Sequence, residues 1–397
     1  MKLFTAKNDT SAARKIVADD MMLTKDMPTA AGSRMLDGYM SLFEAEVITR
    51  LCANGFGICG KADVGEFAID LLGETSYYGA PTADGKLTNA SAEILKAGDA
   101  FAAIGLDVNG SIRRAAAQNG LVSVKPTYGT VSRYGTIPVA CSGETVCVTA
   151  KSADDCQAVL DVMAGHDDKD GTSLSDAQCD QIKSAAGAAK TVKRVAMLKS
   201  LTAGIDAETA AKLAAAKDKL AAQGIEINEV DGEIFACARI AWNILMSAEL
   251  CNNVSRYDGV KYGYRTENFT CIDDLYTNTR TEAFGELLKT TILFGSDSLS
   301  TENYFKDYDK ALRIRRVIVE AFEKLFADYD AVLAPVCSKA AYTENDVAAD
   351  KYIAFKENLY TAPASITGLP TVVAGGVQLI GKAFSENALF DAAKILG

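Results

Sequence analysis

Two patterns alternate along most of this chain of 397 residues: short apolar runs, and longer segments with apolar residues at helical spacing. An apolar run bounded by turn residues is typical of a buried strand, whereas a repeat of three to four residues is typical of a helix that buries one side. Their alternation predicts an α/β fold with a mixed central β-sheet and helices on both of its faces. No linker or internal repeat interrupts the pattern, so we expect a single domain over residues 1–397.

The strongest individual elements can be placed along the chain. Helices are expected over residues 43–54, 92–103, 111–118, 207–223 and 301–327. Strands are expected over residues 191–199, 225–230, 331–336 and, as a pair joined at Gly375 and Gly376, 371–381. Asp206 precedes one of these helices and is expected to be its N-cap.

Composition narrows the class of protein further. A hydrophobic content of 49% and a charged content of 23% support a large core and exclude global disorder. The net charge of −11 disfavours direct binding of nucleic acid or of an anionic membrane through a basic surface. The ten cysteines include no C-x-x-C pair, which favours reduced thiols over disulfides or a zinc site. With no leader and no apolar run of about 18 residues, we expect a cytoplasmic protein without a membrane segment.

The chain contains one histidine, His166, in the polar stretch GHDDKDGTS. A metal centre built on several histidines is therefore impossible, and we expect neither a metal nor another cofactor. We interpret His166 as a solvated loop residue. If the protein performs covalent chemistry, its base is expected to be a residue other than histidine.

Two segments carry residues suited to catalysis. Lys61 directly follows an apolar run, where desolvation would lower its pKa and allow it to act as a base; a lysine that reaches solvent from a strand end is the simpler interpretation. Ser111 follows a turn through Asn109 and Gly110 at the start of a helix. Free N–H groups there suit a nucleophile beside an oxyanion hole; an ordinary serine N-cap is the simpler interpretation of the motif alone.

Several motifs in order resemble a known family. The stretches GKADVGEF, NGSIRRAAAQNG, KPTYGTVSRYG and AGHDDKDGTS are similar to those of the amidase-signature enzymes. Two further stretches, SRYDGVKYGYR and GVQLIGK, resemble the A subunit of the tRNA-dependent amidotransferases in particular. The resemblance runs from about Lys15 to the last residue, and the N-terminal helical region of the family is expected to be missing. It implies the amidase-signature form of the α/β fold.

The resemblance also implies a Ser-cisSer-Lys mechanism, in which a serine attacks the amide carbon and a second serine relays the proton to a lysine. In that pattern Ser111 takes the place of the nucleophile and Lys61 that of the base. The backbone N–H groups of Val108, Asn109 and Gly110 would form the oxyanion hole. Such catalysis requires the three side chains to lie within hydrogen-bond reach of one another.

The chain departs from the family at positions that matter for this chemistry. Counted back from the nucleophile, the relay position falls on Leu87, which has no proton to pass; Thr88 or Ser91 could replace it only if the loop shifts. Thr291 stands where the family's arginine would hold the carboxylate of glutamine. Asn358 stands where an aspartate would receive the substrate ammonium.

Three hypotheses for function follow. The first is an amidase-fold protein with lost or strongly impaired glutaminase activity that acts as a pseudo-subunit or scaffold. The second is an active amidase or glutaminase that supplies ammonia to a tRNA-dependent amidotransferase or hydrolyses another small amide. The third is a binding protein that uses the emptied cleft. Expected partners are other amidotransferase subunits or a second copy of the chain, with glutamine as substrate only in the active case.

Overall fold

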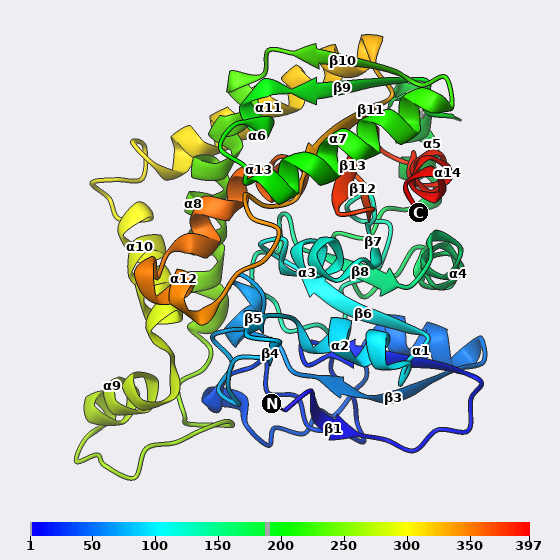
Figure 1. Ribbon diagram of the computed structural model, residues 1–397. Helices are drawn as coiled ribbons and strands as arrows, with labels where there is room; N and C mark the ends of the chain where they lie inside the picture. The colour runs from blue at the N-terminus through cyan, green and yellow to red at the C-terminus, as the bar shows by residue number, and fades with distance from the viewer. Residues whose placement is uncertain (1, 187–190) are drawn as a thin grey trace.

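The computed structural model describes residues 2–186 and 191–397. Its main feature is an 11-stranded sheet with the strand order β1-β3-β2-β6-β8-β7-β12-β13-β11-β9-β10 (Figure 1). Parallel pairs such as β2 with β3 and β6 occur beside antiparallel pairs such as β6 with β8, so the sheet is mixed. Its strands are β1 (Phe4–Lys7), β2 (Arg14–Asp19), β3 (Phe56–Ala62), β6 (Ala102–Asp107), β7 (Val122–Lys125), β8 (Thr145–Ala150), β9 (Arg194–Leu198), β10 (Glu226–Val230), β11 (Ala331–Pro335), β12 (Thr371–Ala374) and β13 (Val377–Gly381). A separate hairpin pairs β4 (Thr82–Ala83) with β5 (Lys86–Leu87).

Helices cover the sheet and extend beyond it on the side of α8 to α13 (Figure 1). The α-helices are α1 (Glu46–Ala53), α2 (Ala90–Ala97), α3 (Ser111–Asn119), α4 (Ala153–Met163), α5 (Asp176–Ala186), α6 (Lys199–Thr202), α7 (Ala207–Ala222), α8 (Glu233–Val254), α9 (Ile272–Ala283), α10 (Glu286–Ser298), α11 (Tyr308–Asp328), α12 (Glu344–Ala349), α13 (Ile353–Thr367) and α14 (Glu386–Leu396). The predicted α/β architecture with a mixed, helix-flanked sheet is confirmed.

Two predicted helices have boundaries that are wrong by more than one helical turn. The helix expected over 92–103 ends at Ala97, because Gly98 adopts a φ of 82° and caps it, and the following apolar residues belong to strand β6. The helix expected from residue 301 begins only at Tyr308. Before it, the amides of Tyr304 and Asp307 donate to the carbonyls of Ser300 and Asn303 in successive turns.

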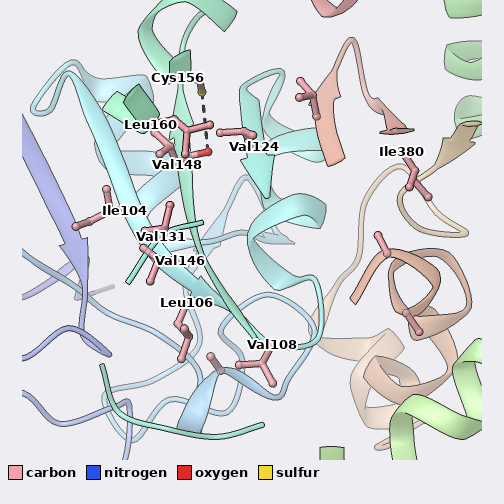
Figure 2. Packing of buried hydrophobic residues seen from close by; sticks show 14 of the residues in the cluster. Ile104, Leu106, Val108, Val124, Val131, Val146, Val148, Cys156, Leu160 and Ile380 are labelled. Carbon is pink, nitrogen blue, oxygen red and sulfur yellow. Dashed lines mark hydrogen bonds between the residues drawn. The ribbon is translucent and has the colours of Figure 1, made fainter. Parts of the chain in front are cut away.

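Around strands β2, β6 and β8, the larger apolar cluster occupies one face of the sheet. Figure 2 shows alternate residues of β6, among them Ile104 and Leu106, beside Val146 and Val148 of β8. Helices α1 and α4 contact the sheet in this region, at β3 and β8. Burial of such side chains stabilises the fold by roughly 25 cal/mol per Å² of apolar surface, and the alternation fixes which residues of each strand point to this face.

A second apolar cluster lies on the opposite face. It includes Val17 of β2, Ala62 of β3 and Ala103 of β6. In β2 and β6 these residues are offset by one position from those of the larger cluster, so their side chains point to the other face. Helices α2 and α3 contribute Leu95 and Ala116 to the same cluster. The sheet therefore separates α2 and α3 from the cluster that contains α1 and α4.

Within the described residues, one helix is long and apolar enough to cross a membrane by length and composition alone. This is α8, and half of its apolar window is buried inside the protein. It packs against α10, α11 and α13, as a core helix does.

Candidate active site

The turn between β6 and α3 positions the candidate nucleophile. Gly110 has a φ of 86°, and Ser111 begins the helix directly after it. A Cβ atom at Gly110 would lie 2.4 Å from the Thr361 Cγ2, so the close approach of α13 requires glycine here. Within the described residues, the backbone N–H groups of Asn109 and Gly110 donate to no other group. The turn thus offers open donors beside a serine, the arrangement that stabilises a developing oxyanion.

The side chain of Asn109 anchors this turn. Its Nδ2 donates to the carbonyl of Ile69 at 2.8 Å, and its Oδ1 accepts from the Trp242 Nε1 at 3.1 Å. Its carbonyl oxygen accepts from the Thr361 hydroxyl at 3.0 Å and from the Arg114 guanidinium at 2.8 Å. Val108, the residue before Asn109, is fully buried in the larger apolar cluster.

A buried ion pair fixes α3 to the end of β6. The Arg113 guanidinium donates to both oxygens of Asp107, at 3.0 and 2.9 Å. It also donates to the Thr361 carbonyl at 3.0 Å and to the Ser365 hydroxyl at 2.8 Å. Burial raises the pKa of Asp107, but the attraction of Arg113 outweighs it and the pKa is lowered. The nucleophile position is therefore held by a charged pair that water does not reach.

Ser111 itself lacks a base. Its side chain is buried, and among the described residues none forms a hydrogen bond with its hydroxyl. Lys61 is also buried, but its ammonium contacts the Met22 carbonyl, the Thr29 hydroxyl at 2.8 Å and the Asp20 carboxylate at 3.3 Å. Desolvation lowers the pKa of Lys61. These contacts hold the Lys61 ammonium, which extends from β3, against the segment that follows β2. Among the described residues, no hydrogen bond joins it to Ser111.

The register of β2 and β3 sets the face of the sheet from which the Lys61 side chain extends. Ala18 pairs with Lys61, and Asp19 pairs with Ala62. Ala18 belongs to the larger cluster and Ala62 to the second one, so the two pairs point to opposite faces. The Lys61 side chain thus leaves the sheet on the face away from α2 and from α3, the helix that Ser111 begins.

Asp19 lies between the sheet and helices α2 and α3. It was not among the site residues expected from the sequence. Its carboxylate accepts from the Ser91 hydroxyl of α2 at 2.5 Å. It lies against Gly105, where an added Cβ would be 2.1 Å from the Asp19 Oδ2 and 2.7 Å from the Ile112 Cδ1 of α3. Burial raises the pKa of Asp19 to about 7. The available signal was the run KIVADD, an apolar strand that ends in two acids.

The expected relay position carries an apolar contact. Leu87 is 3% exposed and packs in the second apolar cluster. Its backbone amide donates to the Tyr342 carbonyl at 2.8 Å, which fixes the hairpin β4–β5. Thr88 donates its hydroxyl to Glu93 at 2.7 Å, and Ser91 donates to Asp19. Both hydroxyls that were considered as replacements are therefore engaged away from Ser111.

The two expected substrate clamps are uncharged and satisfied within the protein. The Thr291 hydroxyl donates to the Leu287 carbonyl of its own helix, α10, at 2.7 Å. The Asn358 amide lies 3.2 Å from the Asn109 Oδ1 and 2.7 Å from the Asn243 Oδ1. Threonine and asparagine carry no charge, so neither residue can offer one to a substrate, and both side chains are buried.

The amidase family matches residues 16–390 of this chain, which belongs to that family. The A subunit of the glutamyl-tRNA(Gln) amidotransferase of Lachnoclostridium phytofermentans is 35% identical over 96% of this chain and 82% of its own length. The protein of the same name from Acinetobacter baumannii is 35% identical over 94% of this chain and 79% of its own length. The resemblance inferred from the motifs is confirmed.

Solved structures agree on the fold. The protein of the same name from Thermotoga maritima superposes with a TM-score of 0.80 at 24% identity, over 100% of this chain and 87% of that one. The 6-aminohexanoate cyclic dimer hydrolase superposes with a TM-score of 0.78 at 18% identity, over 98% and 85% of the two chains. At these identities the likeness concerns the fold, and the roles of Ser111, Lys61 and their neighbours remain predictions.

Proposed function

We propose that this chain is an amidase-family protein, similar to the A subunit of the tRNA-dependent amidotransferases, that has lost glutaminase activity or retains very little of it. It acts as a pseudo-subunit or scaffold in the cytoplasm. The observation that supports this best is Leu87, an apolar side chain packed in a hydrophobic cluster at the relay position. Positioned proton transfer contributes roughly 10²–10⁴-fold to such reactions. The two uncharged clamps, Thr291 and Asn358, add support because they cannot hold the charged head of glutamine.

The relatives carry the name of one component of an amidotransferase, so the partners we propose are the other subunits of such an assembly, or a second copy of this chain. The net charge of −11 argues that any RNA is held by a partner.

Ammonia release from glutamine tests this proposal. We expect the protein and its Ser111→Ala variant to release ammonia at the same background rate, with and without amidotransferase partner subunits, because Ser111 has no base or relay. Thermal unfolding of both proteins would verify that each is folded. Turnover that is present in the unmodified protein and absent from the variant would refute the proposal.

A second candidate is an amidase that acts on a small amide without an amino-acid head group. The open N–H groups at Asn109 and Gly110 favour it, as does the Asp19–Ser91 pair beneath α3. In this case turnover of a simple amide would require both Ser111 and Asp19. Loss of activity in Asp19→Asn as well as in Ser111→Ala would distinguish this reaction from one in which Lys61 is the base.

A further inference from the structure

A cavity of about 440 Å³ lies where the hairpin β4–β5 and its preceding loop meet α10 and α12. Leu87, the residue at the expected relay position, lines it, whereas Ser111 is not among its described lining residues. Cavities of this volume are typical of small-molecule sites. Leu87 therefore connects the cavity to the expected relay position, while the candidate nucleophile is not among the residues described as its walls.

The walls combine apolar surface with an excess of negative charge. Alanine, leucine and valine side chains form the apolar part, from the hairpin, α10 and α12. Four carboxylates and one ammonium form the charged part. The apolar residues are Ala80, Leu87, Leu287, Val347 and Ala348, and the charged ones are Glu66, Glu74, Glu286, Glu344 and Lys351.

The carboxylates differ in how far the protein already satisfies them. Glu66 is buried and accepts from the Ser33 hydroxyl at 2.7 Å and from the Gly285 amide at 2.8 Å. Glu74 accepts from three backbone amides of its own loop. Glu286 pairs at 2.8 Å with Lys351, and both side chains are largely exposed. Glu344 forms no ion pair with any described residue.

No described arginine lines this cavity, and the nearby position expected to hold a carboxylate-binding arginine is Thr291. A ligand with a free carboxylate, such as an amino acid, would meet like charges here. A ligand with an ammonium group would meet opposite charges, and its alkyl chain would cover apolar walls.

We infer that this cavity binds a small primary amine with an alkyl chain, its ammonium between Glu286 and Glu344 and its chain against Leu87, Leu287 and Val347. The inference rests on the proposed function, because a ligand held beside Leu87, at the expected relay position, would be bound and not hydrolysed. Lys351 acts as an internal competitor, since its ammonium occupies one of the carboxylates that the ligand would use.

Calorimetric titration with three matched probes tests the charge preference. Pentylammonium, pentan-1-ol and pentanoate share one chain and differ in the charge of the head group. We expect pentylammonium to bind at least about tenfold more tightly than pentan-1-ol, and pentanoate to show no binding. Equal affinity for the amine and the alcohol, or binding of pentanoate, would overturn the inference.

Two surface variants test the positions of the charges. Glu344→Gln should weaken pentylammonium binding and leave that of pentan-1-ol unchanged, whereas Lys351→Met should strengthen pentylammonium binding because it releases Glu286. Glu302→Gln, at a carboxylate that is 83% exposed and outside the cavity, serves as the matched control and should change neither. Weaker binding in Lys351→Met would contradict the assignment.

The outcome is separable from that of the ammonia assay. If pentylammonium fails to bind while Ser111→Ala and the unmodified protein remain equally inactive on glutamine, this inference is wrong and the proposed function stands. If glutamine turnover depends on Ser111, the proposed function is wrong, whether or not pentylammonium binds.

Discussion

Replacing Arg113 by methionine is expected to lower the free energy of unfolding by about 3–5 kcal/mol, the usual effect of removing one partner from a buried ion pair. Arg113 and Asp107 are both fully buried, and methionine would leave the Asp107 carboxylate without its charge partner. Denaturant unfolding, followed by circular dichroism, measures the change. Arg316→Met serves as the control: the pair between Arg316 and Glu320 is exposed, so the unfolding midpoint should not move measurably.

A second substitution separates charge from packing at this site. The loss of stability in Arg113→Met is expected to arise from the unpaired Asp107 carboxylate. If so, adding Asp107→Asn should restore much of the lost stability, because a neutral amide costs less to bury than a carboxylate. A double variant as unstable as Arg113→Met, or less stable, would show that the hydrogen bonds from Arg113 to Thr361 and Ser365 carry the effect instead.

Asp19→Asn is expected to stabilise the protein at pH 8 by an amount of up to about 4 kcal/mol, since each unit of pKa shift corresponds to about 1.36 kcal/mol. The pKa of Asp19 is about 7 in the folded state, mainly because of burial, against an ordinary value of 3.8. The neighbouring Asp20 and Asp63 raise it further, whereas Ser91 and Lys61 lower it. Asparagine imitates the protonated form and can still accept from the Ser91 hydroxyl.

The direction of the pH effect follows from these values. Below about pH 4 Asp19 is protonated in the folded and unfolded states alike, and the variant gains nothing. Between about pH 4 and 7 the unfolded chain loses the proton that the folded one keeps, so the stability of the unmodified protein falls as the pH rises. From pH 5 to 8, the free energy of unfolding of Asp19→Asn should therefore exceed that of the unmodified protein by an increasing amount. A difference that is constant with pH would exclude Asp19 as its source. Asp218→Asn, at an exposed carboxylate with no ion pair among the described residues, is the control.

The local elements were predictable where the decisive contacts are close in sequence. Asp206 caps its helix through the Thr209 amide at 2.7 Å, as expected from the residues alone. The strand pair near the C-terminus turns at Gly375 and Gly376, whose φ values are 58° and 79°. In both cases a side chain or a backbone preference within four residues decides the outcome.

The site was less predictable because it depends on which face of the sheet a side chain leaves. A lysine after an apolar run indicates burial, and Lys61 is buried. The pairing of Lys61 with Ala18 sets its direction, however, and this register cannot be read from one strand. Acids at the end of a strand usually reach solvent. Asp19 does not, because α2 and α3 cover it, a contact that only the tertiary structure creates.

The order of the sheet also governs how the chain is completed during synthesis. Strands β12 and β13 are synthesised after the other strands of the described sheet, yet they lie between β7 and β11 (Figure 1). Until Thr371 to Gly381 emerge, each of those neighbours presents an unpaired edge, which is a template for aggregation. A premature stop shortly before Thr371 would therefore remove β12 and β13, the two strands through which β7 and β11 are joined in one sheet.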